Sequence, residues 1–429
     1  MAERFSTLGD WLAWQETLHP AEIELGLERV GRVYRRLGGL RPAPVVITVA
    51  GTNGKGSSVT FLEAVLRAAG YRTGAYTSPH LLRYNERIRI DGDEQPDEVI
   101  CDAFARVDDA RGDESLTYFE SGTLAALDIF AHGGLDVAIL EVGLGGRLDA
   151  VNIIDPDVAL VTRIGIDHTD WLGPDRESIG REKAGIFRAG RPAVCADPAP
   201  PRSLAAEAQR VGAPWYALGE QFEHGLAPDA STWHWHGVQT RYDDLPLPTL
   251  AGAHQLLNAS GVLMVLECLR ERLPVPAQAV VQGLQQARLA GRFQRIPGPV
   301  EQVLDVAHNA QGAQVLATAL AQQPCRGRTL ALLGMMADKD CSAFIGPLSG
   351  QVDAWYPVGL QYERAAQPQQ LTQCLRQSLP GVSCQPCPDV ASARQTILQQ
   401  AAEGDRILVC GSFHTVAEWL AAAEPGQRQ

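Results

Sequence analysis

The chain has 429 residues, with 37 lysines and arginines against 50 aspartates and glutamates, and therefore a formal charge of −13. Charged residues make up 20% and hydrophobic residues 45% of the sequence, which excludes a disordered, collagen-like or coiled-coil protein. The acidic balance argues against a protein that coats nucleic acid. At about 150 residues per domain, the length predicts two or three domains.

The cysteines and the N-terminal residues indicate a cytoplasmic protein. Nine cysteines are scattered along the chain, an odd number that does not suggest a disulfide framework. Cys384 and Cys387 form a CxxC pair, but no further ligands with zinc-site spacing accompany them. No apolar run approaches the ~20 residues that span a bilayer, and the first residues hold no apolar signal core. We therefore expect no membrane partner and no nucleic-acid partner.

Strand-like and helix-like segments alternate along most of the chain, which predicts an α/β fold. The run 45–49 is predicted to be a strand, followed by a helix over 57–69. A second helix is predicted over 121–131. The uninterrupted apolar runs 137–142 and 158–162 are typical of buried strands in a parallel sheet.

The region from about 195 to 250 is rich in proline and glycine and differs from the rest. Within it, Trp233-His234-Trp235-His236 alternates with period two, which predicts a hairpin at the edge of the first domain. A ligand site is the alternative interpretation of these residues, and a half-buried strand is the one we favour.

A domain boundary is expected at Pro297-Gly298-Pro299, which cannot continue a helix. The predicted domains are residues 1–296, a P-loop ATPase domain with a mainly parallel sheet, and residues 297–429, a smaller Rossmann-like α/β domain. In the second domain, predicted strands alternate with predicted helices. The strands are 302–306, 329–333, 354–358 and 406–410, and the helices are near 310–322, 368–378, 389–402 and 414–423.

The strongest local signal is the glycine-rich turn AGTNGKGS at 50–57, between a predicted strand and a predicted helix. Gly51, Gly54 and Gly56 allow the backbone to approach an anion, so that successive N–H groups and the helix N-terminus face phosphates. Lys55 is placed to reach the terminal phosphates, and the Ser57 hydroxyl to contact Mg²⁺. The loop departs from the strict Walker pattern, which has Ser or Thr directly after the lysine. The order of strand, glycines, lysine, hydroxyls and helix favours a phosphate loop over an ordinary turn.

Two further predicted strands are followed by possible metal ligands. Glu141 lies at the end of one, and Asp167-His168 follows the next. Because the carboxyl ends of parallel strands face one crevice, we expect Glu141 and His168 to share a Mg²⁺ site. The cluster 141–149 is a poor dinucleotide fingerprint, since Leu148 stands where a glycine is needed.

Several long motifs occur in one order and carry a resemblance. They are GTNGKGS at 51–57, TSPHL at 77–81, EVGLGGRLDAVN at 141–152, DHT at 167–169, GREKAGIFR at 180–188, HQLLN at 254–258, GRFQ at 291–294, DVAHN at 305–309 and GSFHT at 411–415. Together they resemble the Mur-ligase superfamily, and most closely the folylpolyglutamate synthases in their bacterial bifunctional form with dihydrofolate synthase activity.

The resemblance implies an ATP-dependent amide ligase. Dihydropteroate, L-glutamate and ATP would give dihydrofolate, ADP and phosphate, and further cycles would add glutamates to reduced folates. The substrate carboxylate would attack the γ-phosphate, and the amine of glutamate would attack the resulting acyl phosphate. The implied cofactors are ATP and Mg²⁺, and the implied partners are these small molecules. We expect a monomer, although no sequence feature fixes the oligomeric state.

The resemblance also implies roles for individual residues. The phosphate loop consists of Thr52, Asn53, Gly54, Lys55, Gly56 and Ser57. The further ATP contacts are Asn258, Arg292 and Asp305. The Mg²⁺ ligands are Ser78, Glu141 and His168. The pteroate pocket consists of Glu22, Ile23, Glu24, Leu25, Thr117, Tyr118, Phe119, Glu120, Leu148, Asp149 and Ala150. Lys55, Lys183 and His308 are the candidate catalytic residues, with His308 on the second-domain side of the cleft.

Two of these residues have a plainer structural interpretation. Phe119 is placed to stack on a pterin ring, and a core aromatic before a helix is its alternative. Helical spacing puts Lys183 on an apolar face with Ile179 and Phe187, where a lysine stem can simply extend to the surface. Burial would instead lower its pKa, and the resemblance implies that this lysine reacts with CO₂ to give N6-carboxylysine, a carbamate that helps to hold Mg²⁺.

Two other functions compete with this hypothesis. A ligase acting on cell-wall precursors would carry a nucleotide-sugar domain before the phosphate loop, and the loop begins here at Gly51. A regulatory P-loop ATPase without ligase chemistry would not need the second α/β domain. In the ligase, closure of the two domains would keep water from the acyl phosphate.

Overall fold

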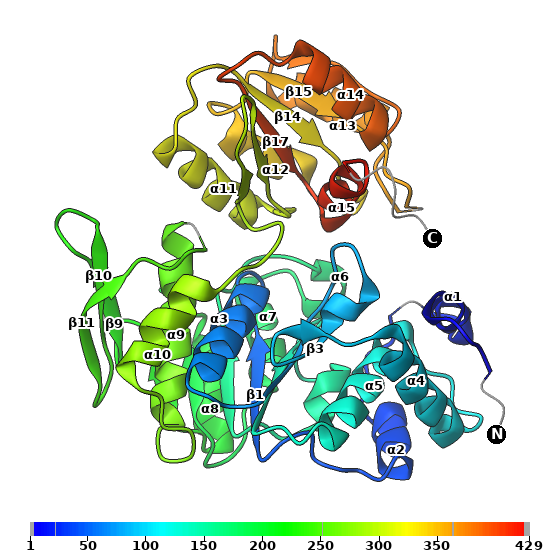
Figure 1. Cartoon of the computed structure of the whole chain (residues 1–429), viewed down its shortest axis with the longest axis vertical. Helices are drawn as coiled ribbons and strands as arrows, with labels where there is room; N and C mark the ends of the chain where they lie inside the picture. Colours follow the sequence, from blue (N-terminus) through cyan, green and yellow to red (C-terminus); the bar gives the residue numbers. More distant parts are fainter. Residues whose placement is uncertain (1–3, 22, 251, 363, 424–429) are drawn as a thin grey trace. The chain divides into compact units, whose positions relative to one another are not determined.

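The computed structural model describes residues 4–21, 23–250, 252–362 and 364–423. Contacts divide the chain into two units: Met1–Thr249 with Gln255–Arg288, and Leu250–His254 with Leu289–Gln429. Figure 1 colours the elements by their place in the sequence, and each unit is described by itself below. No helix in the described ranges is both long and apolar enough to cross a membrane.

The first unit is built on an eight-stranded sheet with the strand order β4-β3-β2-β5-β1-β6-β7-β8. The strands from β2 to β8 in this order pair in parallel, and β3 and β4 add an antiparallel edge. The strands are β1 (Val45–Ala50), β2 (Thr73–Tyr76), β3 (Ile88–Ile90), β4 (Asp93–Glu94), β5 (Val137–Glu141), β6 (Val158–Val161), β7 (Ala193–Cys195) and β8 (Trp215–Ala217). The central strands β1, β5 and β6 are fully buried because helices cover both faces.

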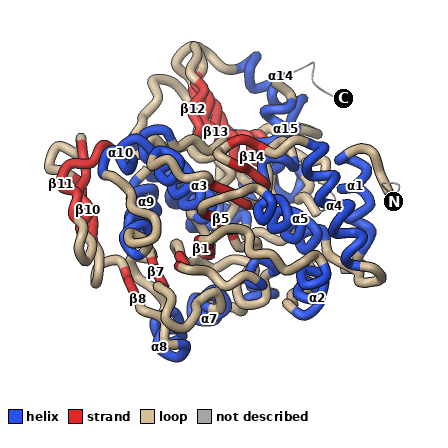
Figure 2. The backbone as a smooth tube through the Cα atoms, turned by 60° about the horizontal axis from the view of Figure 1, so that its bottom comes forward, coloured by secondary structure: helices blue, strands red, loops and turns tan. Residues whose placement is uncertain are grey.

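The helices of this unit include α3, which lies against β1 and β5 in Figure 2 and packs on α10. They are α1 (Leu8–Leu18), α2 (Glu28–Arg36), α3 (Lys55–Ala68), α4 (Asp97–Arg111), α5 (Tyr118–His132), α6 (Thr169–Leu172), α7 (Arg176–Ala184), α8 (Arg202–Val211), α9 (Ala253–Cys268) and α10 (Ala277–Gln286), with the short 3-10 helices η1 (Tyr84–Arg87) and η2 (Ala150–Ile153). The predicted helix at 57–69 begins earlier, at Lys55, because the lysine and Gly56 form its first turn.

The Trp-His alternation lies in a separate antiparallel sheet of three strands. These are β9 (Glu223–Leu226), β10 (Thr232–His236) and β11 (Arg241–Pro246). Trp233 and Trp235 are fully buried, whereas His234 and His236 on the other face are half-buried. The hairpin prediction is confirmed, although its strands pair with one another and not with the main sheet.

The second unit is a smaller α/β unit around a six-stranded sheet with the order β12-β13-β17-β14-β15-β16. All its strands pair in parallel except β12 with β13. The strands are β12 (Gln294–Ile296), β13 (Glu301–Leu304), β14 (Thr329–Leu333), β15 (Ala354–Pro357), β16 (Ser383–Cys384) and β17 (Arg406–Cys410), and the helices are α11 (Ala310–Gln322), α12 (Cys341–Ile345), η3 (Gly346–Leu348), α13 (Pro368–Ser378), α14 (Val390–Gln400) and α15 (Phe413–Ala421).

The Pro-Gly-Pro sequence lies inside this second unit. Residues 297–299 form the turn between β12 and β13, whose residues Gln294 and Leu304 pair across the hairpin. Proline and glycine suit a tight turn as well as a boundary, and the contacts separate the units earlier, after Arg288. The predicted fold class, a mainly parallel N-terminal α/β sheet with a smaller C-terminal α/β domain, is confirmed.

Candidate active site

The glycine-rich turn joins β1 to α3 and depends on two close approaches. Gly54 adopts a left-handed conformation (φ 99°), and a Cβ atom there would lie 2.3 Å from Oδ1 of Asn258. At Gly51, a Cβ atom would lie 1.8 Å from Oγ1 of Thr162 on the neighbouring segment. The loop therefore keeps its shape only with glycine at these positions.

The backbone amides of the turn divide into two groups. Those of Thr52 and Asn53 donate to the carbonyl oxygen of Arg163, at 3.0 and 3.3 Å, and so anchor the loop to the segment after β6. The expectation that successive amides all face an anion is therefore wrong for these two. The first-turn amides of α3 lack intrahelical acceptors by helix geometry and point along the helix axis. Nζ of Lys55 is held over the loop by a hydrogen bond of 3.1 Å to the Gly51 carbonyl oxygen.

Helix α9 contributes two amide side chains that contact the glycine-rich turn. Gln255 and Asn258 are both buried, and the Asn258 amide donates to Oε1 of Gln255 at 2.9 Å. The Gln255 amide in turn donates to Oγ of Ser57 at 3.3 Å. Asn258 is thus brought to the phosphate loop, as its predicted role requires, and Gln255 fixes the orientation of both Asn258 and Ser57.

The predicted metal ligands follow neighbouring strands of the sheet. Glu141 ends β5 and is 4% exposed, and its Oε2 accepts a hydrogen bond of 3.3 Å from the backbone N–H of Ser78, which follows β2. His168 follows β6 and is exposed, with Oδ1 of Asp167 accepting from its backbone N–H at 2.9 Å. His168 has φ 53°, a strained conformation for a residue other than glycine that is common at functional sites.

These ligands suit a hard cation. A carboxylate and a hydroxyl oxygen are typical Mg²⁺ ligands, and Mg²⁺ usually keeps several waters or phosphate oxygens. In the described part of the chain, no three His, Cys, Asp or Glu side chains form a metal-binding group. The predicted set has two such side chains and a hydroxyl, so it fits an ion whose remaining ligands come from water and nucleotide.

Lys183 lies in α7 and is buried, with 4% of the residue exposed. Burial, together with the nearby positive charge of Lys55, lowers its pKa from 10.5 to about 7, although the carboxylates of Asp167 and Asp149 act in the opposite direction. Lys183 is therefore buried, as its place among Ile179 and other apolar residues suggested, and does not extend to the surface. The expectation of a helix through Phe187 is wrong, because α7 ends at Ala184 and the apolar residues after it are buried in a turn.

The loop 142–149 brings Lys183 and Phe119 into one neighbourhood. A Cβ atom on Gly143 would lie 2.6 Å from Cζ of Phe119, and one on Gly146 would lie 3.0 Å from Cα of Lys183. Within the loop, Asp149 is buried and accepts from the N–H groups of Leu144 and Val151 at 2.8 and 3.0 Å. Burial raises the Asp149 pKa to about 6. Leu148 in the same loop is half-buried, and Ala150, which begins η2, is buried.

Phe119 is half-buried, with its ring 6.0 Å from that of Tyr76. It is therefore not enclosed in the core and keeps part of its surface for a ligand. Thr117 and Glu120 form a capping box at the start of α5, in which the Thr117 N–H donates to Oε2 of Glu120 at 2.8 Å. Thr117 and Glu120 therefore stabilise the N-terminus of α5. This helix start in turn fixes the positions of Tyr118 and Phe119.

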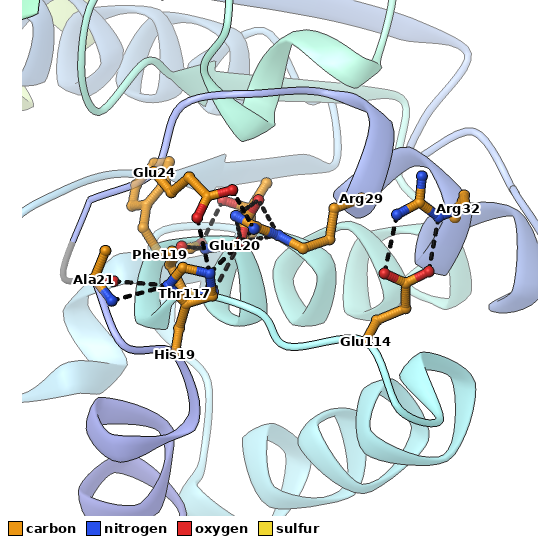
Figure 3. A network of polar contacts seen from close by, with 10 residues as sticks. His19, Ala21, Glu24, Arg29, Arg32, Glu114, Thr117, Phe119 and Glu120 are labelled. Atoms are coloured by element: carbon orange, nitrogen blue, oxygen red, sulfur yellow. Dashed lines mark hydrogen bonds and ion pairs between the residues drawn. The ribbon is translucent and has the colours of Figure 1, made fainter.

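Figure 3 shows a residue that sequence reasoning missed, Arg29. Its guanidinium donates to Glu120 at 2.9 Å and to Oε1 of Glu24 at 2.7 Å. Nε2 of His19 lies 3.1 Å from the other Glu24 oxygen. Arg29 thus ties the segment containing the predicted pocket residues Ile23, Glu24 and Leu25 to the helix that carries Phe119, while Glu22 lies outside the described residues. Arg32 on the same helix forms a more exposed ion pair with Glu114.

Three predicted residues cluster in the second unit. Asp305 is half-buried and accepts from the N–H groups of Phe293 and Ala307, both at 2.8 Å. Burial raises its pKa, against the opposing charge of Arg292. The Arg292 guanidinium lies 5.0 Å from the Phe413 ring, and the His308 ring lies 6.2 Å from it. The contact of this cluster with ATP stays a prediction.

Comparison with known proteins assigns both units. The Mur ligase middle domain matches residues 49–266, and the Mur ligase glutamate ligase domain matches residues 291–413. Dihydrofolate synthase/folylpolyglutamate synthase of Escherichia coli is 46% identical over 96% of this chain and 94% of its own, and the protein of that name from Haemophilus influenzae is 39% identical over 98% of both.

Solved structures agree with these relatives. Escherichia coli FolC in complex with DHPP and ADP has a TM-score of 0.92 at 45% identity, with 99% of both chains covered. The bifunctional folylpolyglutamate synthase/dihydrofolate synthase of Yersinia pestis, complexed with AMPPNP and a manganese ion, has a TM-score of 0.90 at 47% identity, again over 99% of both chains.

The low pKa of Lys183 predicts a pH-dependent stability. The folded state binds fewer protons at this site than the unfolded state between pH of about 7 and 10.5, so this lysine destabilises the fold below that window and does so less as the pH rises through it. We expect Lys183→Met to raise the free energy of unfolding at pH 7, and this gain to shrink at pH 9. Urea unfolding in CO₂-free buffer measures both values, and a gain independent of pH would contradict a charged, buried lysine.

Proposed function

Because this chain belongs to the dihydrofolate synthase/folylpolyglutamate synthase family of Mur ligases, we propose how its residues share the work of the ligase. The protein is an ATP-dependent ligase that adds L-glutamate to dihydropteroate and to reduced folates, with ATP and a divalent cation as cofactors. The residue assignments rest on one observation: loop 142–149 lies against both the Phe119 ring and the backbone of Lys183.

The phosphate loop would hold ATP during formation of an acyl phosphate. The substrate carboxylate attacks the γ-phosphorus, the bond to the β-phosphate oxygen breaks, and ADP leaves. The amine of glutamate then attacks the acyl carbon, and phosphate leaves with formation of the amide. Bringing a carboxylate to a polyphosphate gathers negative charge, which Lys55 and the N-terminus of α3 would offset. Thr52, Asn53, Gly54, Gly56, Ser57 and Asn258 would shape the loop around the phosphates.

Ser78, Glu141 and His168 would hold Mg²⁺ at the carboxyl edge of the sheet. The ion supplies positive charge to the phosphate oxygens when bound. The hydrogen bond from Ser78 to buried Glu141 supports this assignment, since it fixes one carboxylate oxygen and orients the other.

Lys183 would be carbamylated and catalytic through the metal. Its neutral amine attacks CO₂, an N–C bond forms, and a proton is released, which leaves an anionic N6-carboxylysine. A pKa of about 7 supports this reaction, because half or more of the amine is neutral at and above that pH.

The pteroate pocket would be formed largely by the first unit. Phe119 would stack on the pterin, and Tyr118, Leu148, Asp149 and Ala150 would surround it. The half-buried state of Phe119 and its packing on Gly143 support a ligand surface rather than a core role. Thr117, Glu120 and the segment 22–25 complete the predicted pocket.

In the second unit, Arg292 and Asp305 would contact the nucleotide, and His308 would act in catalysis. Their clustering around Phe413 supports one shared site. We further propose that the protein works as a monomer in the cytoplasm, which size-exclusion chromatography and cell fractionation would test.

A product assay tests the function and the role of Lys55 together. With ATP, Mg²⁺, glutamate and either dihydropteroate or tetrahydrofolate, chromatography should detect dihydrofolate or elongated folate. Lys55→Ala should form no product above background yet keep the thermal midpoint of the wild type, because Lys55 is half-buried and, among the described residues, donates to the loop carbonyl oxygens of Gly51 and Thr52. Near-normal turnover of this variant would contradict the assignment of residues 52–57 as the phosphate loop.

Glu141→Gln keeps the shape of the side chain and removes its charge. We expect the Mg²⁺ concentration for half-maximal activity to rise by at least about tenfold, the lower range seen for partners outside the ligand shell. Glu98→Gln on the exposed face of α4 is the matched control and should leave the Mg²⁺ titration unchanged. An unchanged titration of Glu141→Gln would place the metal elsewhere.

Phe119→Ala should weaken dihydropteroate binding by about threefold to tenfold, the range for loss of an aromatic stacking contact. ATP binding should stay the same, since Phe119 is not part of the phosphate loop. Phe119→Leu keeps apolar volume without a ring face, so its affinity for dihydropteroate should lie between those of the wild type and Phe119→Ala. Titration calorimetry measures both ligands, and equal losses for both would indicate a core role.

Lys183→Ala should lose activity and regain part of it with added formate or acetate, which replace the missing carboxylate. Propylamine, which would replace a cation, should not restore activity, and acetate should not stimulate the wild type. Restoration by propylamine alone would show that the amine itself is needed and overturn the carbamate.

A further inference from the structure

A second buried cation, Arg87, lies beside the predicted pteroate pocket. It ends η1, and only 9% of the residue is exposed. Nε of Arg87 donates to Nδ1 of His80 at 2.8 Å, so one of its five N–H donors is used on a neutral ring. Within the described chain no carboxylate forms an ion pair with Arg87, whereas Arg29 pairs with Glu120 and Arg89 with Glu63.

Aromatic rings hold the guanidinium without neutralising it. Its Cζ atom lies 5.3 Å from the centre of the Tyr84 ring and 5.5 Å from that of Tyr118. Such cation–π contacts stabilise the charge in part and leave the Nη donors unused. In the described part of the chain, neither Nη atom has an acceptor, and neither is among the polar atoms sealed from solvent.

A buried arginine of this kind calls for an anion. Its guanidinium does not lose its proton in proteins, so burial without a counter-ion is costly. The planar fork matches a carboxylate in a bidentate geometry, which a lysine cannot reproduce.

The position of Arg87 identifies the anion. Tyr118 precedes Phe119, and Tyr76, whose ring contacts Phe119, also feels the Arg87 charge: burial raises the Tyr76 pKa to about 12, and Arg87 opposes that rise. His80 follows Ser78 by two positions in the sequence. Arg87 therefore neighbours both the predicted pterin surface and the segment with a predicted metal ligand.

We propose that Arg87 binds a carboxylate of the folate substrate through its Nη donors. The inference rests on the proposed function, because dihydropteroate and reduced folates supply the carboxylate. Two sources share this chemistry: the carboxylate that reacts, and the α-carboxylate of a glutamate already attached to a reduced folate.

Binding measurements on the full chain, without ATP or metal, test the proposal. The ligands are dihydropteroate, its methyl ester and tetrahydrofolate, and the variants are Arg87→Gln, Arg87→Lys and the control Arg83→Gln, which removes an exposed charge from the same segment. We expect Arg87→Gln to weaken dihydropteroate binding by about 10- to 100-fold and to leave binding of the ester unchanged. Arg87→Lys should recover part of the loss, and Arg83→Gln should match the wild type.

The tetrahydrofolate arm separates the two sources. Loss for dihydropteroate, with or without loss for tetrahydrofolate, assigns Arg87 to the reacting carboxylate. Loss for tetrahydrofolate alone assigns Arg87 to the α-carboxylate of the attached glutamate. No loss for either acid, or an equal loss for acid and ester, overturns the proposal.

A measurement of thermal stability distinguishes a loss of ligand binding from a folding defect. Arg87→Met removes a charge with no counter-ion, so its thermal midpoint without ligand should equal or exceed that of the wild type, while the rise on adding dihydropteroate should disappear. A large fall in the midpoint would show a structural role and overturn the proposal. If the wild type itself forms no dihydrofolate, the proposed function fails; if it does and Arg87→Gln binds normally, only this inference fails.

Discussion

The candidate site depends on the close approach of loop 142–149 to two helices. Gly143 faces the Phe119 ring, and Gly146 faces the backbone of α7 at Lys183. A Cβ atom at either position would push one helix away from the loop. Asp149 accepts hydrogen bonds from the N–H groups of Leu144 and Val151 and so holds the loop in one conformation. The loop therefore cannot move by itself to make room for a Cβ atom at Gly143 or Gly146. One rigid turn therefore sets the distance between the predicted pterin surface and the predicted carbamate.

The buried charges around this loop fall into two classes. Arg29 and Glu120 neutralise each other, and the pair fixes the start of α5. Lys183 and Arg87 are as deeply buried, yet no carboxylate within the described ranges forms an ion pair with either. Paired charges of this kind act on the fold, whereas a buried charge without a partner destabilises the free protein and stabilises a complex. The unpaired buried charges of Lys183 and Arg87 therefore indicate where charged groups of ligands bind.

The sequence predicted the sheet strands and the phosphate loop because both are local. Short β-branched and apolar runs such as 137–140 favour buried strands, and the phosphate loop consists of consecutive residues. Residues that act through distant partners gave no such signal. Arg29 contacts Glu120 across 91 positions, and the Arg163 carbonyl that accepts from the Thr52 and Asn53 amides comes from the segment after β6. Helix ends were also missed, as at Ala184, where apolar spacing continues into a buried turn.

Local charge resolves an apparent conflict in the composition. The chain carries a formal charge of −13 and yet binds ATP and folates, which are anions. Surface carboxylates more than about 8 Å away are largely screened at physiological salt, whereas buried cations act across a medium of low dielectric constant. Lys55, Lys183 and Arg87 all lie in the first unit, near its predicted ligands. Carbamylation would change Lys183 from a cation to an anion, a shift of two charges that a divalent ion cancels. Modification and metal binding would therefore favour each other, since either change alone leaves the buried site with uncompensated charge.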